Sequence, residues 1–153
     1  MYFGIYILLI FFLDRFSKHS IVNNFSEQKY YVNDFLNIDL IWNSGVGFGL
    51  LSFNNPIYYE LITLLIGLII VILFYIFLNS KGFEKLIFST IVGGALGNFY
   101  DRLFTKAVPD FIDFHYNNFH WFTFNVADIF VTIGVIFLLI KNFYEPNSNE
   151  KNN

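Results

Sequence analysis

The sequence predicts a mainly α-helical membrane protein: four transmembrane helices with a small extracytoplasmic β-sheet and loop region at the outer membrane face. Of its 153 residues, 56% are apolar and only 14% are charged, whereas soluble domains carry about 25% charged residues. Several apolar stretches are long enough to cross a hydrocarbon core of about 30 Å. Between them lie polar segments with the alternation of strands. The length allows one polytopic domain, 1–153.

Composition also limits the classes of function. The net charge of −3 is small and scattered, which argues against a nucleic-acid partner. The chain has no cysteine, which excludes disulfides, thiolate metal sites and cysteine nucleophiles. The aromatic content of 22% is attributed to a drift toward Phe, Ile, Asn and Lys rather than to a cofactor cage.

The first predicted helix spans about residues 2–22. A cleaved signal peptide is the alternative, but no basic region precedes the apolar run and no Ala-x-Ala-like site follows it. Asp14, Arg15 and Lys18 also interrupt the run. Asp14 and Lys18 are four residues apart, so they share a helix face and can pair. The plainer interpretation is a salt bridge or a snorkelling lysine at the membrane edge.

Residues 23–56 are polar enough to lie outside the bilayer. Apolar and polar residues alternate from Leu36 to Trp42, which predicts a strand. Asn43-Ser44-Gly45 is a turn signal, and Val46 to Phe53 is expected to return as a second strand. A small antiparallel sheet at the membrane surface follows from these signals.

Two further helices are predicted over 57–78 and 85–101. The first is a continuous apolar run long enough to span the bilayer. The second contains Gly93 and Gly97, a small-residue pair that lets membrane helices approach closely. Asn98 and Asp101 are three residues apart and share one face at its end, and Arg102 follows at the boundary.

The last part of the chain repeats the pattern of outer segment and helix. Residues 102–123 leave the bilayer, with strand signals from Phe111 to Tyr116 and from Phe119 to Phe124. The fourth helix is predicted over 124–144, with Asn125 and Asp128 on its first turn. The polar tail, 145–153, is expected to be disordered.

Basic residues set the expected orientation. Lys81, Lys85, Lys141 and Lys151 flank one side of the predicted helices, against Lys29 and Lys106 in the two long loops. By the positive-inside rule, both termini are cytoplasmic and both long loops are outside. The polar residues at the helix ends and in the loops then gather at the outer face.

Carboxylates are the candidate chemical groups at that face. The region from Gly93 to Asp128 holds four, Asp101, Asp110, Asp113 and Asp128. Two neighbouring aspartates that share one proton can activate a water and polarise a carbonyl without a cofactor. The plainer interpretation makes them loop and helix-cap residues.

Other chemistries and functions receive less support. The histidines His115 and His120 are five residues apart, a weak metal signal, and no serine has an evident base, so neither a metal nor a serine nucleophile is expected. A small transporter using the acids as a polar path is a second hypothesis. A structural membrane subunit is a third. The charges cluster at one face, which favours an enzyme site over a path.

Five sequence blocks in order resemble the lipoprotein signal peptidase (signal peptidase II) family of bacterial membrane aspartic proteases. Their patterns are D-x-x-[TS]-K, N-x-G-x-A-F-G, G-G-A-x-G-N-x-x-D-R, V-x-D-F and F-N-x-A-D. Each block alone is weak, but five in order, covering about residues 10–140, are specific. The blocks are Asp14 to Lys18, Asn43 to Gly49, Gly93 to Arg102, Val108 to Phe111 and Phe124 to Asp128.

The resemblance implies residue roles. Asp110 and Asp128 match the two catalytic aspartates, whereas Asn98 and Arg102 match residues that hold the substrate backbone. Asp113 matches no required position. Gly47 and Phe122 depart from the family pattern, at positions where Ala and Pro are usual. Further motif positions that support or line the site are Asp14, Lys18, Asn43, Gly45, Asp101 and Asn125.

The implied activity is hydrolysis of a peptide bond at the outer face of a bacterial cytoplasmic (inner) membrane. The substrate would be a prolipoprotein whose Cys bears a diacylglyceryl group, cleaved just before that Cys. No cofactor is implied. Membrane lipids are the expected surroundings, and a monomer is the expected state.

Overall fold

The computed structural model describes residues 2–45, 56–117 and 119–144. The predicted second strand from Val46 to Phe53, the departure at Gly47 and the predicted tail 145–153 therefore lie outside the described residues.

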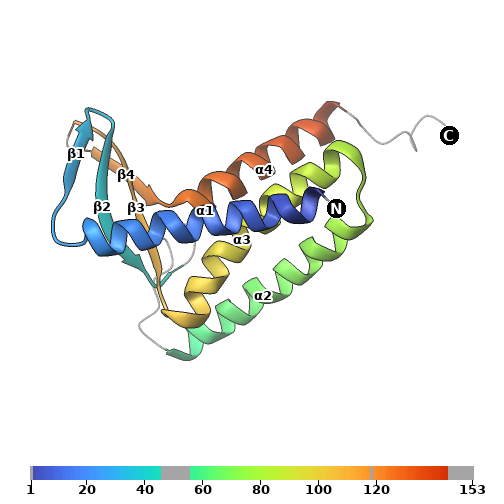
Figure 1. The fold of residues 1–153 in the computed structure, drawn as a ribbon, viewed down its shortest axis with the longest axis horizontal. Helices are drawn as coiled ribbons and strands as arrows, with labels where there is room; N and C mark the ends of the chain where they lie inside the picture. The colour runs from blue at the N-terminus through green and yellow to red at the C-terminus, as the bar shows by residue number, and fades with distance from the viewer. Residues whose placement is uncertain (1, 46–55, 118, 145–153) are drawn as a thin grey trace.

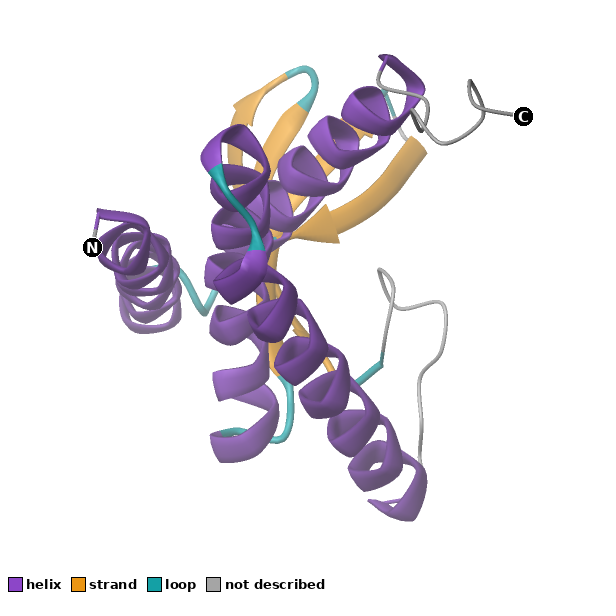
Figure 2. Ribbon diagram, turned by 90° about the vertical axis from the view of Figure 1, so that its right-hand side faces the viewer, coloured by secondary structure: helices purple, strands orange, loops and turns teal. Residues whose placement is uncertain are grey.

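Four long helices form one end of the molecule. They are α1 (Tyr2–Asn24), α2 (Pro56–Asn79), α3 (Gly82–Phe104) and α4 (Val126–Tyr144). Helix α3 is central, because it packs against each of the other three, as Figures 1 and 2 show. The predicted ranges differ from these bounds by at most three residues at either end. The third helix extends furthest past its prediction, to Phe104.

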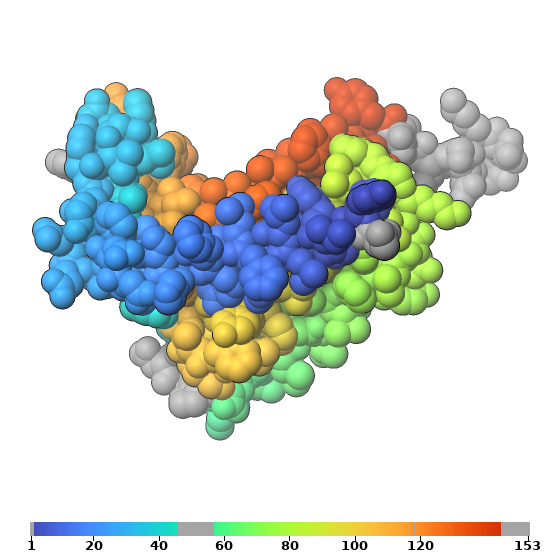
Figure 3. All heavy atoms as spheres, viewed as in Figure 1, coloured from blue at the N-terminus to red at the C-terminus, as the bar shows by residue number. Residues whose placement is uncertain are grey.

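A four-stranded antiparallel sheet stands at one end of the helices, beside the last turns of α1, as Figures 1 and 3 show. Its order is β1 (Tyr30–Asn33), β2 (Leu36–Asn43), β3 (Val108–Tyr116) and β4 (Phe119–Phe124). The predicted β2 and the β3–β4 hairpin are present. Strand β1 was not predicted, since its four residues are all exposed and carry no alternation. Strand β2 joins the two outer segments by pairing with β3.

Two of the helices are long and apolar enough to cross a membrane, among the residues that the structure describes. They are Ile57–Asn79, with a mean hydropathy of 3.2, and Val126–Tyr144, with 2.0. Helix α1 carries three charged residues in its second half, and α3 begins and ends with charges, so neither stands out by composition. Large apolar side chains such as Leu64 (62% exposed) cover the outside of α2.

Glycines let the helices approach closely around α3. A Cβ at Gly93 would lie 2.9 Å from the Cβ of Ile10 on α1. A Cβ at Gly94 would lie 2.6 Å from the backbone oxygen of Ala127 on α4. The small-residue face predicted for this helix is therefore a packing face, which holds α1 and α4 against α3.

Candidate active site

Asp110 and Asp128 lie at the junction of the sheet with the helices. Asp110 is on β3 and only 3% exposed, and Asp128 is on the first turn of α4. Each of their four carboxylate oxygens accepts one N–H hydrogen bond. Asp110 Oδ2 accepts from Asn43 Nδ2 at 2.8 Å, and Asp110 Oδ1 accepts from Asn125 Nδ2 at 2.6 Å. Asp128 Oδ1 accepts from Asn98 Nδ2 at 2.7 Å, and Asp128 Oδ2 accepts from the Asn125 backbone N–H at 3.1 Å.

The electrostatics of Asp110 suit a group that holds a proton near neutral pH. Burial, and next the charge of Asp128, raise its pKa from 3.8 to about 6. The amides of Asn43 and Asn125 oppose this rise, because they favour the ionised form. Asp128 is thus near enough for the two carboxyl groups to titrate as a coupled pair.

The first turn of α4 is held by a reciprocal cap. Asn125 Oδ1 accepts from the backbone N–H of Asp128 at 3.1 Å, and Asp128 Oδ2 accepts from that of Asn125. This exchange is a capping box, with the acid three residues after the cap. The cap interpretation of these two residues is therefore correct, and the same carboxylate also faces Asp110.

A buried charge cluster stands behind the two aspartates. Lys18 is 1% exposed, and its ammonium lies 2.9 Å from Asp14 Oδ2 and 2.7 Å from Asp101 Oδ2. Lys18 also donates to Asn98 Oδ1 at 2.8 Å. Asp14 accepts from the backbone N–H of Ala127 at 2.9 Å. The predicted pair of Asp14 and Lys18 is thus a salt bridge, and it is buried where α1, α3 and α4 meet.

Arg102 lies on the side of the site toward the residues after β2. It is buried, and its Nη2 donates to the backbone oxygen of Gly45 at 2.7 Å. Its Nη1 has no hydrogen-bond partner among the described residues. A buried guanidinium donor without a partner is suited to a carbonyl oxygen of an extended peptide.

Asp113 is buried in the sheet, in a cluster of its own. It is three residues from Asp110 on one strand, so the two side chains point to opposite faces. Lys29 Nζ lies 2.8 Å from Asp113 Oδ2, and His120 Nδ1 lies 2.8 Å from Asp113 Oδ1. Burial raises the pKa of Asp113, but hydrogen bonds from Lys29, His120 and Asn37 outweigh it and lower that pKa to about 2.

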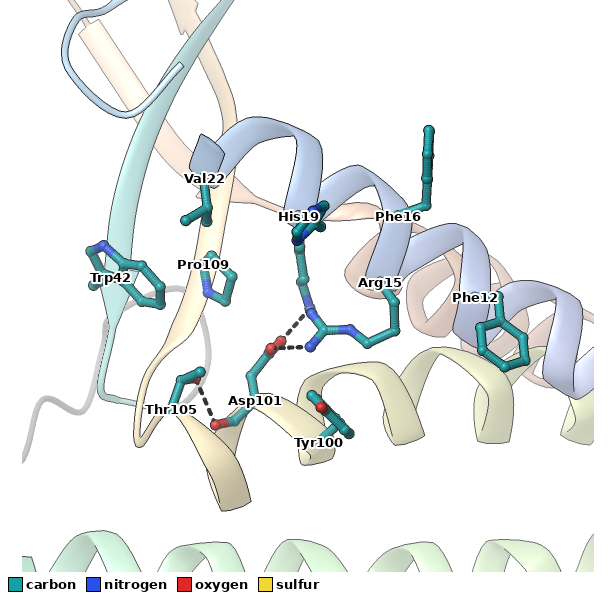
Figure 4. A pocket seen from close by; sticks show the side chains of 11 residues that line it. Phe12, Arg15, Phe16, His19, Val22, Trp42, Tyr100, Asp101, Thr105 and Pro109 are labelled. Atoms are coloured by element: carbon teal, nitrogen blue, oxygen red, sulfur yellow. Dashed lines mark hydrogen bonds and ion pairs between the residues drawn. The ribbon is translucent and has the colours of Figure 1, made fainter. Parts of the chain in front are cut away.

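A cavity of about 620 Å³ lies on the other side of the charge cluster, and Figure 4 shows it from close by. Arg15 reaches across it to Asp101, at 2.5 Å, with its guanidinium 4.7 Å from the ring centre of Tyr100. Trp42 and Pro109, which are register partners on β2 and β3, form one wall. Neither Asp110 nor Asp128 lines this cavity.

The structure brings together most of the residues that the sequence singled out. Around the two aspartates lie Asn43, Asn98 and Asn125, with Asp14, Lys18 and Asp101 behind them and Arg102 with Gly45 to one side. Arg15 was not singled out, and its bond to Asp101 spans 86 positions of sequence. No local pattern signals such a contact. In the described part of the chain, no three His, Cys, Asp or Glu side chains form a group that could hold a metal ion.

Comparison with known proteins identifies similar chains. A "Lipoprotein signal peptidase" of Pelagibacter ubique is 46% identical over 151 residues, which cover 95% of this chain and 91% of that one. A "Lipoprotein signal peptidase" of Francisella tularensis subsp. novicida is 38% identical over 143 residues, 90% of this chain and 88% of that one. The family model described as "Signal peptidase (SPase) II" matches residues 6–144.

Solved structures give the same result for the fold. A bacterial membrane enzyme determined by the in meso method at 2.3 Å has a TM-score of 0.79 and 31% identity. The match covers 99% of this chain and 92% of that one. A second, determined at 1.9 Å, has a TM-score of 0.73 and 31% identity, with 90% of each chain covered.

The fold is therefore that of a bacterial membrane enzyme, mainly helical with a four-stranded antiparallel sheet. More narrowly, the chain belongs to the signal peptidase II family, whose members are peptidases. Family membership favours the peptidase hypothesis over the transporter and structural-subunit hypotheses.

Proposed function

We propose that this chain is an aspartic endopeptidase that removes the signal peptide from diacylglyceryl-modified prolipoproteins, cleaving just before the lipid-bearing Cys. The observation that carries the mechanism is the set of four N–H donors, one on each oxygen of Asp110 and Asp128. These donors hold two carboxyl groups in place, and burial together with the charge of Asp128 raises the pKa of Asp110. A paired acid and base result.

Hydrolysis follows from that pairing. The ionised carboxylate takes a proton from water, and the water oxygen bonds to the carbonyl carbon of the scissile peptide. The protonated partner donates to the carbonyl oxygen, which carries the developing negative charge. When the tetrahedral intermediate collapses, the C–N bond breaks, the carboxyl group that took the proton from water gives it to the leaving nitrogen, and the other carboxylate regains its proton from the oxygen as the carbonyl re-forms. No metal or cofactor takes part in these steps.

The surrounding residues position the substrate. Nη1 of Arg102, which has no hydrogen-bond partner within the described ranges, is suited to a substrate carbonyl, and Asn98 borders Asp128. We assign Asp14, Lys18, Asn43, Gly45, Asp101 and Asn125 to the support of the site. Asn43 and Asn125 donate to Asp110, Lys18 donates to Asn98, and Gly45 accepts from Arg102. Asp14 and Asp101 bind the ammonium of Lys18 and so hold it in place.

The membrane arrangement is part of the proposal. We infer four spans in one polytopic domain, 1–153, that acts as a monomer in the inner membrane, with both termini cytoplasmic and the dyad at the outer face. The support is that the sheet lies at one end of the helices (Figure 1), with Asp110 on β3 and Asp128 on the first turn of α4. The sequence adds an excess of lysines in the segments predicted to face the cytoplasm. A site at that depth can receive a signal helix and its lipid chains from the bilayer.

The first test is cleavage of a diacylglyceryl-modified prolipoprotein by the purified protein in detergent, with the product sized by mass spectrometry. We expect cleavage before the modified Cys, and none of the same precursor without its lipid. Asp110→Asn and Asp128→Asn should each lower the rate by at least about 10³-fold, since each removes one half of the acid–base pair. Cleavage near the wild-type rate by either folded variant would contradict the dyad.

A matched control is Asp113→Asn, which removes a third buried aspartate from the same strand as Asp110. Because Asp113 lies on the opposite face of the sheet, the folded variant should retain cleavage. Loss of cleavage in a folded Asp113→Asn protein would mean that the site extends across the sheet.

A further inference from the structure

Three asparagine side chains border the dyad. In each one the amide oxygen, Oδ1, accepts a hydrogen bond that fixes the orientation of the amide. Asn43 Oδ1 accepts from the Gly45 backbone N–H at 2.8 Å, so its NH2 faces Asp110. Asn125 Oδ1 accepts from a backbone N–H of α4, so its NH2 also faces Asp110. Asn98 differs, because its Oδ1 accepts from the side chain of Lys18 at 2.8 Å.

The Lys18 contact decides which end of the Asn98 amide meets Asp128. An ammonium group can only donate, so it binds the oxygen end of the amide. The NH2 end is then left for Asp128 Oδ1, at 2.7 Å. A flipped amide would place its oxygen against the Asp128 carboxylate, with two acceptors facing each other and a second clash between NH2 and ammonium.

Lys18 is itself held firmly. Its side chain is 1% exposed, and Asp14 and Asp101 bind its ammonium from α1 and α3 at 2.9 and 2.7 Å. Arg15 binds the other oxygen of Asp101. The ammonium therefore has a fixed position, and a fixed donor can orient the amide. The charged groups that face this part of the site are Asp14, Arg15 and Lys18 from α1, Asp101 and Arg102 from α3, Asp110 from β3 and Asp128 from α4.

We propose that Lys18 is a positioning residue: it orients the Asn98 amide and so keeps Asp128 as the ionised partner of the dyad. This proposal rests on the proposed function. Asp128 then takes the proton from water, and Asp110 carries the proton that is donated to the substrate carbonyl. Lys18 donates no hydrogen bond to the dyad and orients it through Asn98, while its charge lowers the pKa of Asp110.

Two substitutions of Lys18 distinguish its effect on the orientation of the Asn98 amide from the effect of its positive charge. Lys18→Met removes both the donor and the charge at nearly constant volume, whereas Lys18→Gln removes the charge but keeps an N–H donor. Lys29→Met is the matched control, because Lys29 is the other lysine bound to a buried aspartate, at 2.8 Å from Asp113. For each protein, kcat and KM for the lipid-modified precursor are measured from about pH 5 to pH 9, and thermal unfolding in detergent confirms folding.

We expect Lys18→Met to lower kcat by about 10- to 100-fold, the rate equivalent of one hydrogen bond to a charged group, with KM changed less than about twofold. Both limbs of its pH profile should move up by about one pH unit, since a nearby positive charge is lost. Lys18→Gln should show the same pH shift but a higher kcat than Lys18→Met. Lys29→Met should unfold at a lower temperature with its pH profile unmoved.

The outcomes separate this inference from the proposed function. If the wild-type protein fails to cleave, or Asp110→Asn cleaves normally, the proposed function is wrong. If those results hold but Lys18→Met keeps the wild-type pH profile and kcat, the positioning role is overturned. Equal kcat values for Lys18→Met and Lys18→Gln would also overturn it, because charge alone would then explain the loss. If Lys18→Met does not fold, a wild-type pH profile for Lys18→Gln overturns it.

Discussion

At the scale of single residues, two aspartates on strand β3 have pKa values that are shifted in opposite directions. Asp110 is buried and faces another carboxyl group, and burial first and that charge second raise its pKa to about 6. Asp113 faces a lysine, a histidine and an amide, and its pKa is lowered to about 2. Burial raises the pKa of both groups, and only for Asp113 do the hydrogen bonds from its partners outweigh burial and reverse the direction. The first setting suits proton transfer, and the second suits stability.

Asp113 should stabilise the fold in a pH-dependent way. Its pKa falls from 3.8 in the unfolded chain to about 2 in the folded protein, so its contribution is full above about pH 4 and is lost as the pH falls toward 2. We expect Asp113→Asn to lower the free energy of unfolding by about 2 kcal/mol at pH 7. Denaturant unfolding in detergent measures the difference. A gap that stays constant down to pH 2 would contradict the ion-pair explanation.

At the scale of elements, the contact between α1 and α3 depends on the absence of one methyl group. A Cβ at Gly97 would overlap Asp14 Oδ2, the oxygen that binds Lys18. The helices meet at this point through a carboxylate packed directly on the α3 backbone. Packing and the buried charge cluster therefore depend on the same glycine.

Gly97→Ala should push α1 away from α3 and at the same time disturb the charge cluster behind the dyad. We expect a loss of about 1–3 kcal/mol in stability, typical of overpacking, and a clear loss of cleavage. Gly4→Ala is the matched control on α1, since a Cβ at Gly4 meets nothing within 4 Å and alanine favours a helix. Thermal unfolding and cleavage assays of both variants test this. Wild-type behaviour of Gly97→Ala would show that the backbone can shift at no cost.

The elements also show how far the sequence alone reaches. Apolar runs predicted all four helices to within a few residues, because length and hydrophobicity are local properties. Strand β1 was missed, because its residues are exposed on both faces and owe their conformation to pairing with β2. The capping pair Asn125 and Asp128 was visible from spacing alone. The bond between Arg15 and Asp101 was not, since it depends on how α1 crosses α3.

At the scale of the whole molecule, the separation of the two halves makes the proposed orientation testable. Glu27 lies in the segment before the sheet, and Lys81 lies in the turn between α2 and α3, at the opposite end. Both are exposed. The chain contains no cysteine, so a single introduced thiol reports on one position only.

We expect Glu27→Cys to react with a membrane-impermeant thiol reagent added to cells whose outer envelope has been opened, while Lys81→Cys reacts only after the inner membrane is lysed. The reason is the positive-inside rule, which assigns the lysine-rich turn to the cytoplasm. Labelling measured by mass shift tests the arrangement. The reverse pattern would invert the topology, and equal labelling of both intact samples would contradict a spanning arrangement.

The first turn of α4 has two roles, since it both stabilises the charge of Asp128 and depends on the Asp128 side chain for its own cap. Its peptide dipoles point their positive end at Asp128, which favours negative charge there. The turn is also fastened by that same side chain. If the first turn frays, Asp128 loses the stabilisation that the helix dipole gives its charge, while the rest of α4 remains helical. This enzyme should therefore lose its chemistry while its helices are still assembled, and its working range should be narrower than its folded range.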